Sequence, residues 1–210
     1  NTFATPVLQR PLALGADVVI HSTTKFINGH GTVIGGALVC RDPDFMENGG
    51  GSLVRYIGAV PSAMDCWLTS IGLKTLPLRM REHCANARAL AEFLDSNDRV
   101  VRTHWPGLET HPQHEIAASQ MDDFGAMISI DMGDFDSATR LMDGLTMCSL
   151  AVSLGNVDTL VQHPASMTHR LMSEEDRLAV GITNGMIRIS AGIESAKDII
   201  ADFDRAISGL

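Results

Sequence analysis

The chain has 210 residues, 45% of them hydrophobic, so it can bury a substantial core and is long enough for one large or two small domains. Its 16 basic and 25 acidic residues give a net charge of −9 without a block of like charge, which argues against nucleic acid or an anionic membrane as the main partner. A small-molecule ligand or another protein subunit fits this composition better.

The cysteines and the first residues of the sequence indicate the cellular compartment in which we expect the protein. The four cysteines form no CxxC pair and are too few for a disulfide scaffold, so we expect reduced thiols and a cytoplasmic protein. No apolar run reaches about 18 residues, and the first residues lack the regions of a signal peptide. The chain does not begin with methionine, and we expect it to be a fragment of a longer protein.

The first half of the chain predicts two strands, a loop and a helix. ADVVIHS (16–22) is an apolar, β-branched run typical of a strand buried on both faces of its sheet, and GGALVC (35–40) predicts a second strand. Polar residues and glycines predict a mobile loop over 41–52. From Leu76, apolar residues at helical spacing predict a long amphipathic helix that ends at about Leu94 and bridges two domains.

The second half alternates short strands with helices. Three strands are predicted, at 99–105, 125–132 and 186–190. Ser173 with Asp176, and Ser195 with Asp198, have the spacing of a capping box, and the helix after Ser195 has an apolar face that we expect to pack on a sheet. The pattern predicts an α/β fold for residues 1 to about 70 and α+β for the remainder.

Lys25 stands out in HSTTKFINGHGTVIGG (21–36). A lysine at a strand end is most often a solvent-exposed charge, and its amine reacts poorly unless burial or a nearby cation lowers its pKa. A phosphate-binding P-loop needs glycines before the lysine, whereas here they follow it, which excludes that motif. Two interpretations remain, a solvent-exposed charge and a catalytic amine at the carboxyl edge of an α/β sheet, where such folds bind ligands.

Two residues with hydroxyl groups precede this lysine. Ser22 and Thr24, two apart in extended chain, are expected to point the same way and to donate hydrogen bonds to a phosphate. This arrangement suits a phosphorylated aldehyde that is held by its phosphate and condensed with the amine of Lys25. Pyridoxal phosphate is such an aldehyde.

The segment NTFATPVLQRPLALGADVVIHSTTKF resembles the lysine segment of the pyridoxal-phosphate enzymes of cysteine and methionine metabolism. The resemblance continues through GLKTLPLRMREHCANARALAEFL, AVSLGNVDTLVQHPASMTH and GMIRISAGIE, covers nearly the whole chain, and within the family is strongest to the methionine γ-lyases. It implies the fold type I, aspartate aminotransferase-like architecture, with the C-terminal part of the large cofactor-binding domain at 1–73 and a small C-terminal α+β domain at 74–210. It also implies that Lys25 bonds pyridoxal 5′-phosphate and that Ser22 and Thr24 bind the phosphate.

Arg188 is the candidate for substrate binding. It alternates with two isoleucines in MIRIS (186–190) and faces away from the core if they face it. Such an arginine is most often a surface residue, but a fixed guanidinium also suits a bidentate contact with an α-carboxylate. The resemblance implies this second role and pairs Arg188 with Ser153. At Val152 the members that cleave cystathionine usually carry a glutamate, so the valine favours a substrate with an apolar distal end.

The resemblance therefore implies a lyase that converts L-methionine to methanethiol, 2-oxobutanoate and ammonia, with Lys25 removing the Cα proton. Because YIGAVPSAMDCW is more like the cystathionine γ-lyase segment, that activity and O-acylhomoserine sulfhydrylase stay as alternatives. An alternative of another class is a non-catalytic C-terminal fragment that assembles with a missing N-terminal half. The resemblance places further site residues, including an aspartate just before Asn1, upstream, and implies a homotetramer with shared active sites.

No metal site is predicted. His163 and His169 lie six positions apart, which does not fit the paired ligand spacings of zinc sites, so we interpret both as structural.

Overall fold

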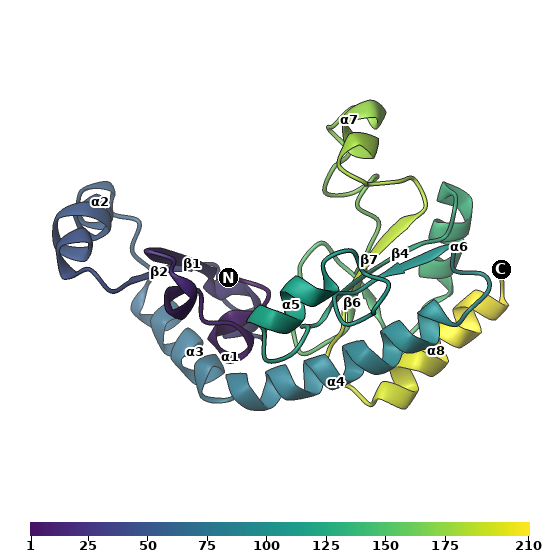
Figure 1. Ribbon diagram of the computed structural model, residues 1–210, viewed down its shortest axis with the longest axis horizontal. Helices are drawn as coiled ribbons and strands as arrows, with labels where there is room; N and C mark the ends of the chain where they lie inside the picture. Colours follow the sequence, from purple (N-terminus) through teal and green to yellow (C-terminus); the bar gives the residue numbers. More distant parts are fainter.

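The computed structural model describes residues 1–210, in which one long helix, α4 (Leu76–Asp95), joins two parts of an elongated molecule (Figure 1). This confirms the predicted helix. The part before it is built from α1 (Thr5–Leu8), a 3-10 turn (Pro11–Leu14), β1 (Val18–Ser22), β2 (Gly36–Cys40), α2 (Gly51–Ile57) and α3 (Ala63–Lys74). Both predicted strands are present and pair antiparallel as a two-stranded sheet.

The strand β1 is buried on one face only. Val19 and His21 are buried, whereas the side chain of Ile20 between them is 65% exposed. The expectation of a strand buried on both faces is therefore wrong for this chain. The sheet has only two strands, and on the side of Ile20 the helical residues 45–57 line an open hollow that leaves this side chain exposed.

The loop predicted over 41–52 is also wrong, because a helical turn (Phe45–Gly50) runs directly into α2. Gly50 and Gly51 have helical backbone angles. The aromatic ring of Phe45 lies against Gly49 and Gly50, which leave room for it because they carry no side chain. The glycines thus let an aromatic residue pack within the turn, an effect that composition alone does not reveal.

The part that follows α4 contains a five-stranded mixed sheet in the order β3-β4-β7-β6-β5, in which only β5 and β6 are parallel. Its strands are β3 (Arg102–His104), β4 (Met127–Asp131), β5 (Ser149–Leu150), β6 (Leu160–Gln162) and β7 (Met186–Ser190). Its helices are α5 (His114–Gln120), α6 (Phe135–Gly144), α7 (Glu174–Ala179) and α8 (Ala196–Ser208). The three predicted strands are confirmed, while β5 and β6 are too short for a periodic pattern.

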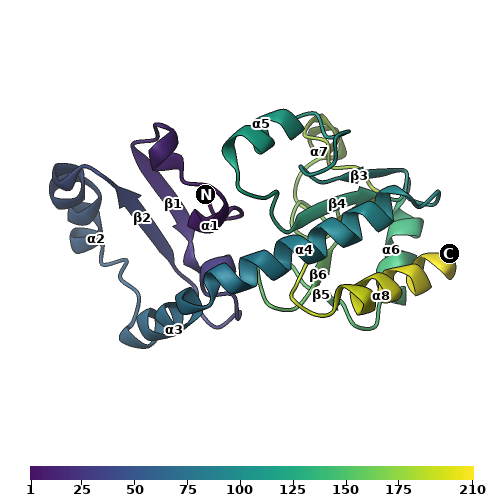
Figure 2. The ribbon, with the colours of Figure 1, turned by 60° about the horizontal axis from the view of Figure 1, so that its bottom comes forward.

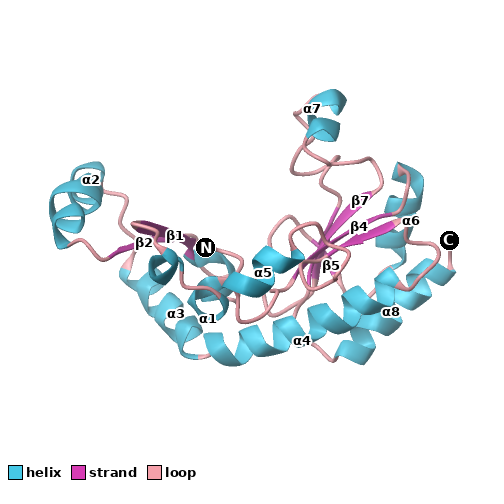
Figure 3. Cartoon of the chain, in the orientation of Figure 1, coloured by secondary structure: helices cyan, strands magenta, loops and turns pink.

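Helices α4, α6 and α8 line one side of this sheet, and α7 projects from it (Figure 3). The apolar face of α8 is buried as predicted; the helix lies against α4 and α6, and its buried side chains belong to the same core cluster as those of β4 and β7. A single cluster of buried apolar residues extends from Leu8 and Phe26 through α4 to Phe203. The domain boundary at residues 73 and 74 remains a prediction, since this core crosses it. None of the helices combines the length and apolar character needed to cross a membrane.

The two predicted helix caps differ. The hydroxyl of Ser173 accepts a hydrogen bond from the backbone N–H of Asp176 at 3.1 Å, which confirms a cap at the start of α7. Ser195 makes no side-chain cap, so that prediction is wrong. There the backbone carbonyl of Ser195 accepts the N–H of Asp198 at 2.9 Å, which leaves the hydroxyl no role.

Asp202 of α8 is a buried charge that fixes the loop before β5. Its carboxylate accepts hydrogen bonds from the backbone N–H groups of Thr146, Met147 and Cys148, each at 3.0 Å, and one from Arg205. Burial alone would raise the pKa of this carboxyl, but the three backbone donors and Arg205 hold the pKa well below its ordinary value. The folded state thus favours the ionised form of Asp202.

We expect Asp202→Ala to lower the free energy of unfolding by about 3 kcal/mol, because buried N–H groups lose their acceptor. Because the folded-state pKa is depressed, the contribution of Asp202 is present at neutral pH and is lost only as pH falls below about 4, the unfolded value. Urea unfolding at several pH values measures this, with Asp204→Ala, exposed on the same helix, as the control. Equal losses for both variants would contradict it.

Candidate active site

Lys25 lies in a short π-helical turn, Thr23–Ile27, which we call the lysine turn. β1 ends at Ser22, and the backbone N–H groups of Thr23 and Thr24 both donate to the carbonyl of Gly35, at 2.9 and 3.4 Å. Lys25 itself departs from helical geometry, with φ −90° and ψ −135°. The expectation that Ser22 and Thr24 are neighbours in extended chain is therefore wrong, because the chain turns between them.

The fold brings three of the predicted residues together. The Nζ of Lys25 donates a hydrogen bond to the Oγ of Ser153 at 3.3 Å. The guanidinium of Arg188, on β7, donates to the carbonyl oxygens of Val152 and Ser153 at 3.2 and 2.9 Å. Ser153 follows β5 and thus links the lysine turn to the strand that carries Arg188. An amine and a guanidinium that are far apart in sequence share one site.

The electrostatics of this site favour a reactive amine. Burial lowers the pKa of Lys25, and the positive charge of Arg188 lowers it further. Burial also lowers the pKa of Arg188, although a guanidinium stays charged at any physiological pH. A larger fraction of Lys25 is therefore neutral near pH 7 than for a solvent-exposed lysine, as a nucleophile or general base requires.

The hydroxyls of Ser22 and Thr24 differ in their availability. The hydroxyl of Thr24 accepts the N–H of Gly35 at 2.9 Å and donates to the Gly35 carbonyl at 3.3 Å. No hydrogen bond is recorded for the Ser22 hydroxyl, which is half-buried. An amine with a lowered pKa beside these two hydroxyls is a donor set that fits a phosphorylated aldehyde, with Thr24 exchanging its bond to the Gly35 carbonyl.

Val152 lies beside this group through its backbone. Its carbonyl accepts from Arg188, but its side chain is 56% exposed. The structure therefore places Val152 next to the site without enclosing its side chain, and its contact with a substrate remains a prediction.

Gly155 and Ser190 are contributors that the sequence did not single out. Gly155 has φ +74°, and a Cβ there would lie 2.6 Å from the backbone nitrogen of Phe26, in the lysine turn. Its N–H donates to the hydroxyl of Ser190, on β7, at 2.9 Å. The glycine of SLG therefore lets the Ser153 loop approach Lys25 closely. The glycine two positions after the candidate serine was the available signal.

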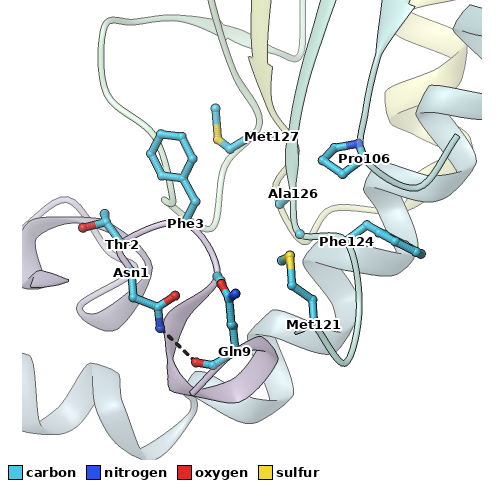
Figure 4. Close-up of a pocket in the computed structure, with 11 residues that line it drawn as sticks. Asn1, Thr2, Phe3, Gln9, Pro106, Met121, Phe124, Ala126 and Met127 are labelled. Atoms are coloured by element: carbon cyan, nitrogen blue, oxygen red, sulfur yellow. Dashed lines mark hydrogen bonds between the residues drawn. The ribbon is translucent and has the colours of Figure 1, made fainter. Parts of the chain in front are cut away.

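One cavity near the site contains none of the side chains of Lys25, Ser153 and Arg188. It has a volume of about 560 Å³ and opens between the first residues and the start of β4. Figure 4 shows Phe3 pointing toward Met127, with Gln9 accepting a hydrogen bond from the Asn1 side chain at 2.9 Å. Apolar side chains dominate its lining, so the chemistry is better placed at Lys25, Ser153 and Arg188.

One of the two histidines interpreted as structural, His163, has a hydrogen-bond partner for each ring nitrogen. His163 is buried, with Nδ1 in a hydrogen bond with the Ser166 hydroxyl and Nε2 in one with the Asn184 carbonyl, both at 2.8 Å. Both ring nitrogens thus hold local structure, as predicted.

Comparisons with known proteins place these residues in context. The family described as Cys/Met metabolism PLP-dependent enzyme matches residues 1–208. The L-methionine gamma-lyase of Fusobacterium nucleatum subsp. polymorphum is 49% identical over 214 residues, covering 99% of this chain and 53% of that protein. A cystathionine beta-lyase of Lactococcus lactis subsp. cremoris (strain MG1363) is 45% identical over 207 residues, covering 99% and 54%. The chain spans about half the length of the curated relatives it matches.

Solved structures agree in fold. Cystathionine gamma lyase (CalE6) from Micromonospora echinospora superposes with a TM-score of 0.95 at 48% identity, covering 100% of this chain and 55% of that one. Cystathionine gamma synthase from Xanthomonas oryzae pv. oryzae gives a TM-score of 0.95 at 47% identity, covering 99% and 54%. At this level of identity the chain shares a family with its relatives as well as a fold.

Proposed function

The chain belongs to the Cys/Met metabolism PLP-dependent enzyme family, and on that premise we propose that the protein containing it is a carbon–sulfur lyase acting on L-methionine. The family uses pyridoxal phosphate, and its fold is the predicted fold type I, α/β with a mixed sheet. The observation that carries the proposal is the contact of Lys25 with Ser153 beside Arg188. Relatives named L-methionine gamma-lyase, at 49% and 48% identity, support methionine as the substrate.

Each residue has a role in this proposal. Lys25 would hold the cofactor covalently before the reaction and would be a free amine once the substrate's own amino group has replaced it, while Ser22 and Thr24 would bind the phosphate. Bound pyridoxal phosphate supplies an electron sink that makes the Cα proton of an amino acid acidic. Lys25 then acts as the general base that removes this proton, while Ser153 keeps the amine oriented through their hydrogen bond. Arg188 binds the α-carboxylate with its guanidinium.

The net reaction balances with one water molecule. L-Methionine and water give methanethiol, 2-oxobutanoate and ammonia, as the bond between Cγ and sulfur breaks. Arg188 orients the substrate, because its two carbonyl partners hold the guanidinium close to Lys25. A substrate carboxylate bound there sets its Cα near the base.

Substrate competition tests this proposal. We expect kcat/KM to be highest for methionine when it is compared with cystathionine and with O-acylhomoserine plus sulfide. A higher value for cystathionine would instead favour a cystathionine γ-lyase, a candidate supported by two solved structures that carry that name. A higher value with acylhomoserine and sulfide would indicate a sulfhydrylase.

A non-catalytic role is the alternative of another class. If the 210-residue chain acts only by assembling with a further segment, the purified protein shows no cofactor absorbance. Under the enzyme proposal, the protein is yellow and borohydride bleaches it while fixing the cofactor on Lys25, which peptide mass spectrometry detects.

Val152 is proposed to set the preference for an apolar distal group. We expect Val152→Glu to raise the ratio of activity on cystathionine to activity on methionine by about tenfold, because a carboxylate pairs with the distal ammonium of cystathionine. Val152→Gln, similar in size and uncharged, is the matched control and should change the ratio little. Steady-state kinetics on both substrates give the ratio, and the same ratio in all three proteins would contradict this role.

We propose a cytoplasmic homotetramer with shared active sites as the working assembly. The open face of β1 and the exposed apolar side chains of α3 support a partner surface, since Ile20 and Trp67 are 65% and 59% exposed. Analytical ultracentrifugation measures the oligomer directly.

A further inference from the structure

Arg79, in the first turns of α4, is a buried cation bonded to the lysine turn. The residue is 5% exposed, and Figure 2 shows α4 beginning beside α3, near the end of β1 and the start of β2. Two of its nitrogens donate to the carbonyl oxygens of Phe26 and Ile27, at 2.7 and 3.2 Å. These two residues follow Lys25 directly, so the guanidinium contacts the backbone next to the reactive amine.

The same guanidinium also holds the end of α3. Its NH2 group donates to the carbonyl of Gly72 at 2.8 Å, and its Nε donates to the hydroxyl of Thr75 at 3.0 Å. Arg79 therefore joins three segments, the lysine turn, the end of α3 and the start of α4, through four hydrogen bonds. Its planar fork of donors makes this possible, because a lysine has only one nitrogen.

No carboxylate is among the partners of Arg79, and none of the ion pairs in the structure includes it. Burial lowers its pKa, yet a guanidinium remains charged. A buried charge without a counterion is costly, so all of its compensation comes from neutral carbonyl and hydroxyl oxygens. A purely structural contact between α4 and the turn would be made at lower cost by apolar side chains.

Two glycines provide the space for this arrangement. A Cβ at Gly29 would overlap the guanidinium of Arg79, and one at Gly72 would overlap the carbonyl of Asn28. Gly29 also has φ +72°, which an L-residue with a side chain rarely adopts. The chain thus omits side chains where the lysine turn, α3 and Arg79 meet.

We propose that Arg79 is a positioning residue for Lys25: it holds the two carbonyls after Lys25 and so fixes where the amine lies relative to Ser153. This inference rests on the proposed function of Lys25. Arg79 acts by geometry rather than by its charge, since the positive neighbour that lowers the pKa of Lys25 is Arg188. Without the fork, the carbonyls of Phe26 and Ile27 lose their donor, and the turn rearranges to satisfy them.

The test uses Arg79→Gln and Arg79→Lys in the full-length protein. In both variants we expect kcat to fall about 10- to 100-fold with KM changed less than about threefold, because a displaced base slows the chemical step more than it weakens binding. The lysine variant keeps the charge but not the fork, so its defect should resemble that of the glutamine variant. Arg81→Gln, exposed two positions further along α4, is the matched control and should behave as wild type.

A second measurement does not depend on turnover. In cofactor-free protein, acetylation of Lys25 is followed by peptide mass spectrometry as a function of pH. When the amine leaves its partly buried place beside Arg188, its pKa should rise, and labelling near pH 8 should fall about threefold or more in both Arg79 variants.

The outcomes separate two failures. If the wild-type protein lacks lyase activity, the proposed function is wrong, while the labelling profile still decides the role of Arg79. If folded Arg79 variants keep the wild-type kcat and the wild-type labelling profile, the positioning role is overturned. Should Arg79→Gln not fold, Thr75→Val removes the Nε acceptor together with the hydrogen bond from the Thr75 hydroxyl to the Gly72 carbonyl; a several-fold fall in kcat supports the role, whereas an unchanged kcat overturns it.

Discussion

Lys25→Ala is expected to lower kcat for methionine about 10²- to 10⁴-fold, the range usually lost with a general base. The loss should exceed that of any other single replacement, because the proposed function gives Lys25 two tasks, covalent attachment of the cofactor and proton removal. Steady-state kinetics measure the fall in kcat. Borohydride treatment followed by mass spectrometry measures the loss of cofactor attachment, since the variant has no amine to which the cofactor can be fixed.

Controls distinguish lost chemistry from lost structure. Lys25→Arg keeps a positive charge but cannot bond an aldehyde in the same way, so it should be as inactive as the alanine variant. Lys197→Ala, which removes an exposed lysine of α8, should be fully active. Added methylamine should partly restore turnover to the alanine variant, because a small amine can occupy the space of the side chain. Appreciable activity without any added amine would contradict a base at position 25.

Arg188→Gln is expected to lower kcat/KM for methionine by about 10- to 150-fold, which corresponds to roughly 1.5–3 kcal/mol for charge-assisted hydrogen bonds. The loss has two sources. The substrate carboxylate loses its cationic partner, and Val152 and Ser153 lose the donor that holds their carbonyls. Because Ser153 also accepts from Lys25, part of the defect should appear in kcat rather than in KM.

A substrate analogue without the carboxylate separates these sources. Wild-type protein should bind 3-(methylthio)propylamine much more weakly than methionine, and Arg188→Gln should bind the two with nearly equal affinity. Arg170→Gln, a change away from the group of Lys25, Ser153 and Arg188, is the control. If Arg188→Gln kept the wild-type preference for the carboxylate, Arg188 would not be its binding partner.

The sequence predicted the long elements well because their patterns extend over several turns or alternations. The spacing of apolar residues gave α4 almost to its last residue, and the alternation in MIRIS gave β7. Where a pattern was short the prediction failed: β5 and β6 span two and three residues, and Ser62, not Ser195, begins a helix with a full capping box. A cap depends on backbone angles that the residue type does not determine.

The candidate site could be proposed from the sequence, but its geometry could not. Residue type and position pointed to Lys25 and Arg188, the family resemblance added Ser153, and the structure brings these three residues together. The turn after Ser22 was not predictable, because Thr23 and Thr24 suit strands as well as turns. Nor did spacing reveal Arg79, which looks like one more charge on an amphipathic helix until its carbonyl partners are known.

The helix α4 restricts how the two parts of the chain can move relative to each other. Its 20 residues make a rod about 30 Å long, tied at one end to the lysine turn by Arg79 and buried at the other among the helices that line the larger sheet. A hinge motion of one part against the other would have to break the buried hydrogen bonds of Arg79 or bend α4. Under the proposed function, entry of an amino acid and escape of a thiol would depend on small local rearrangements at the mouth of the site, and we expect variants that stiffen α4 to leave the turnover rate unchanged.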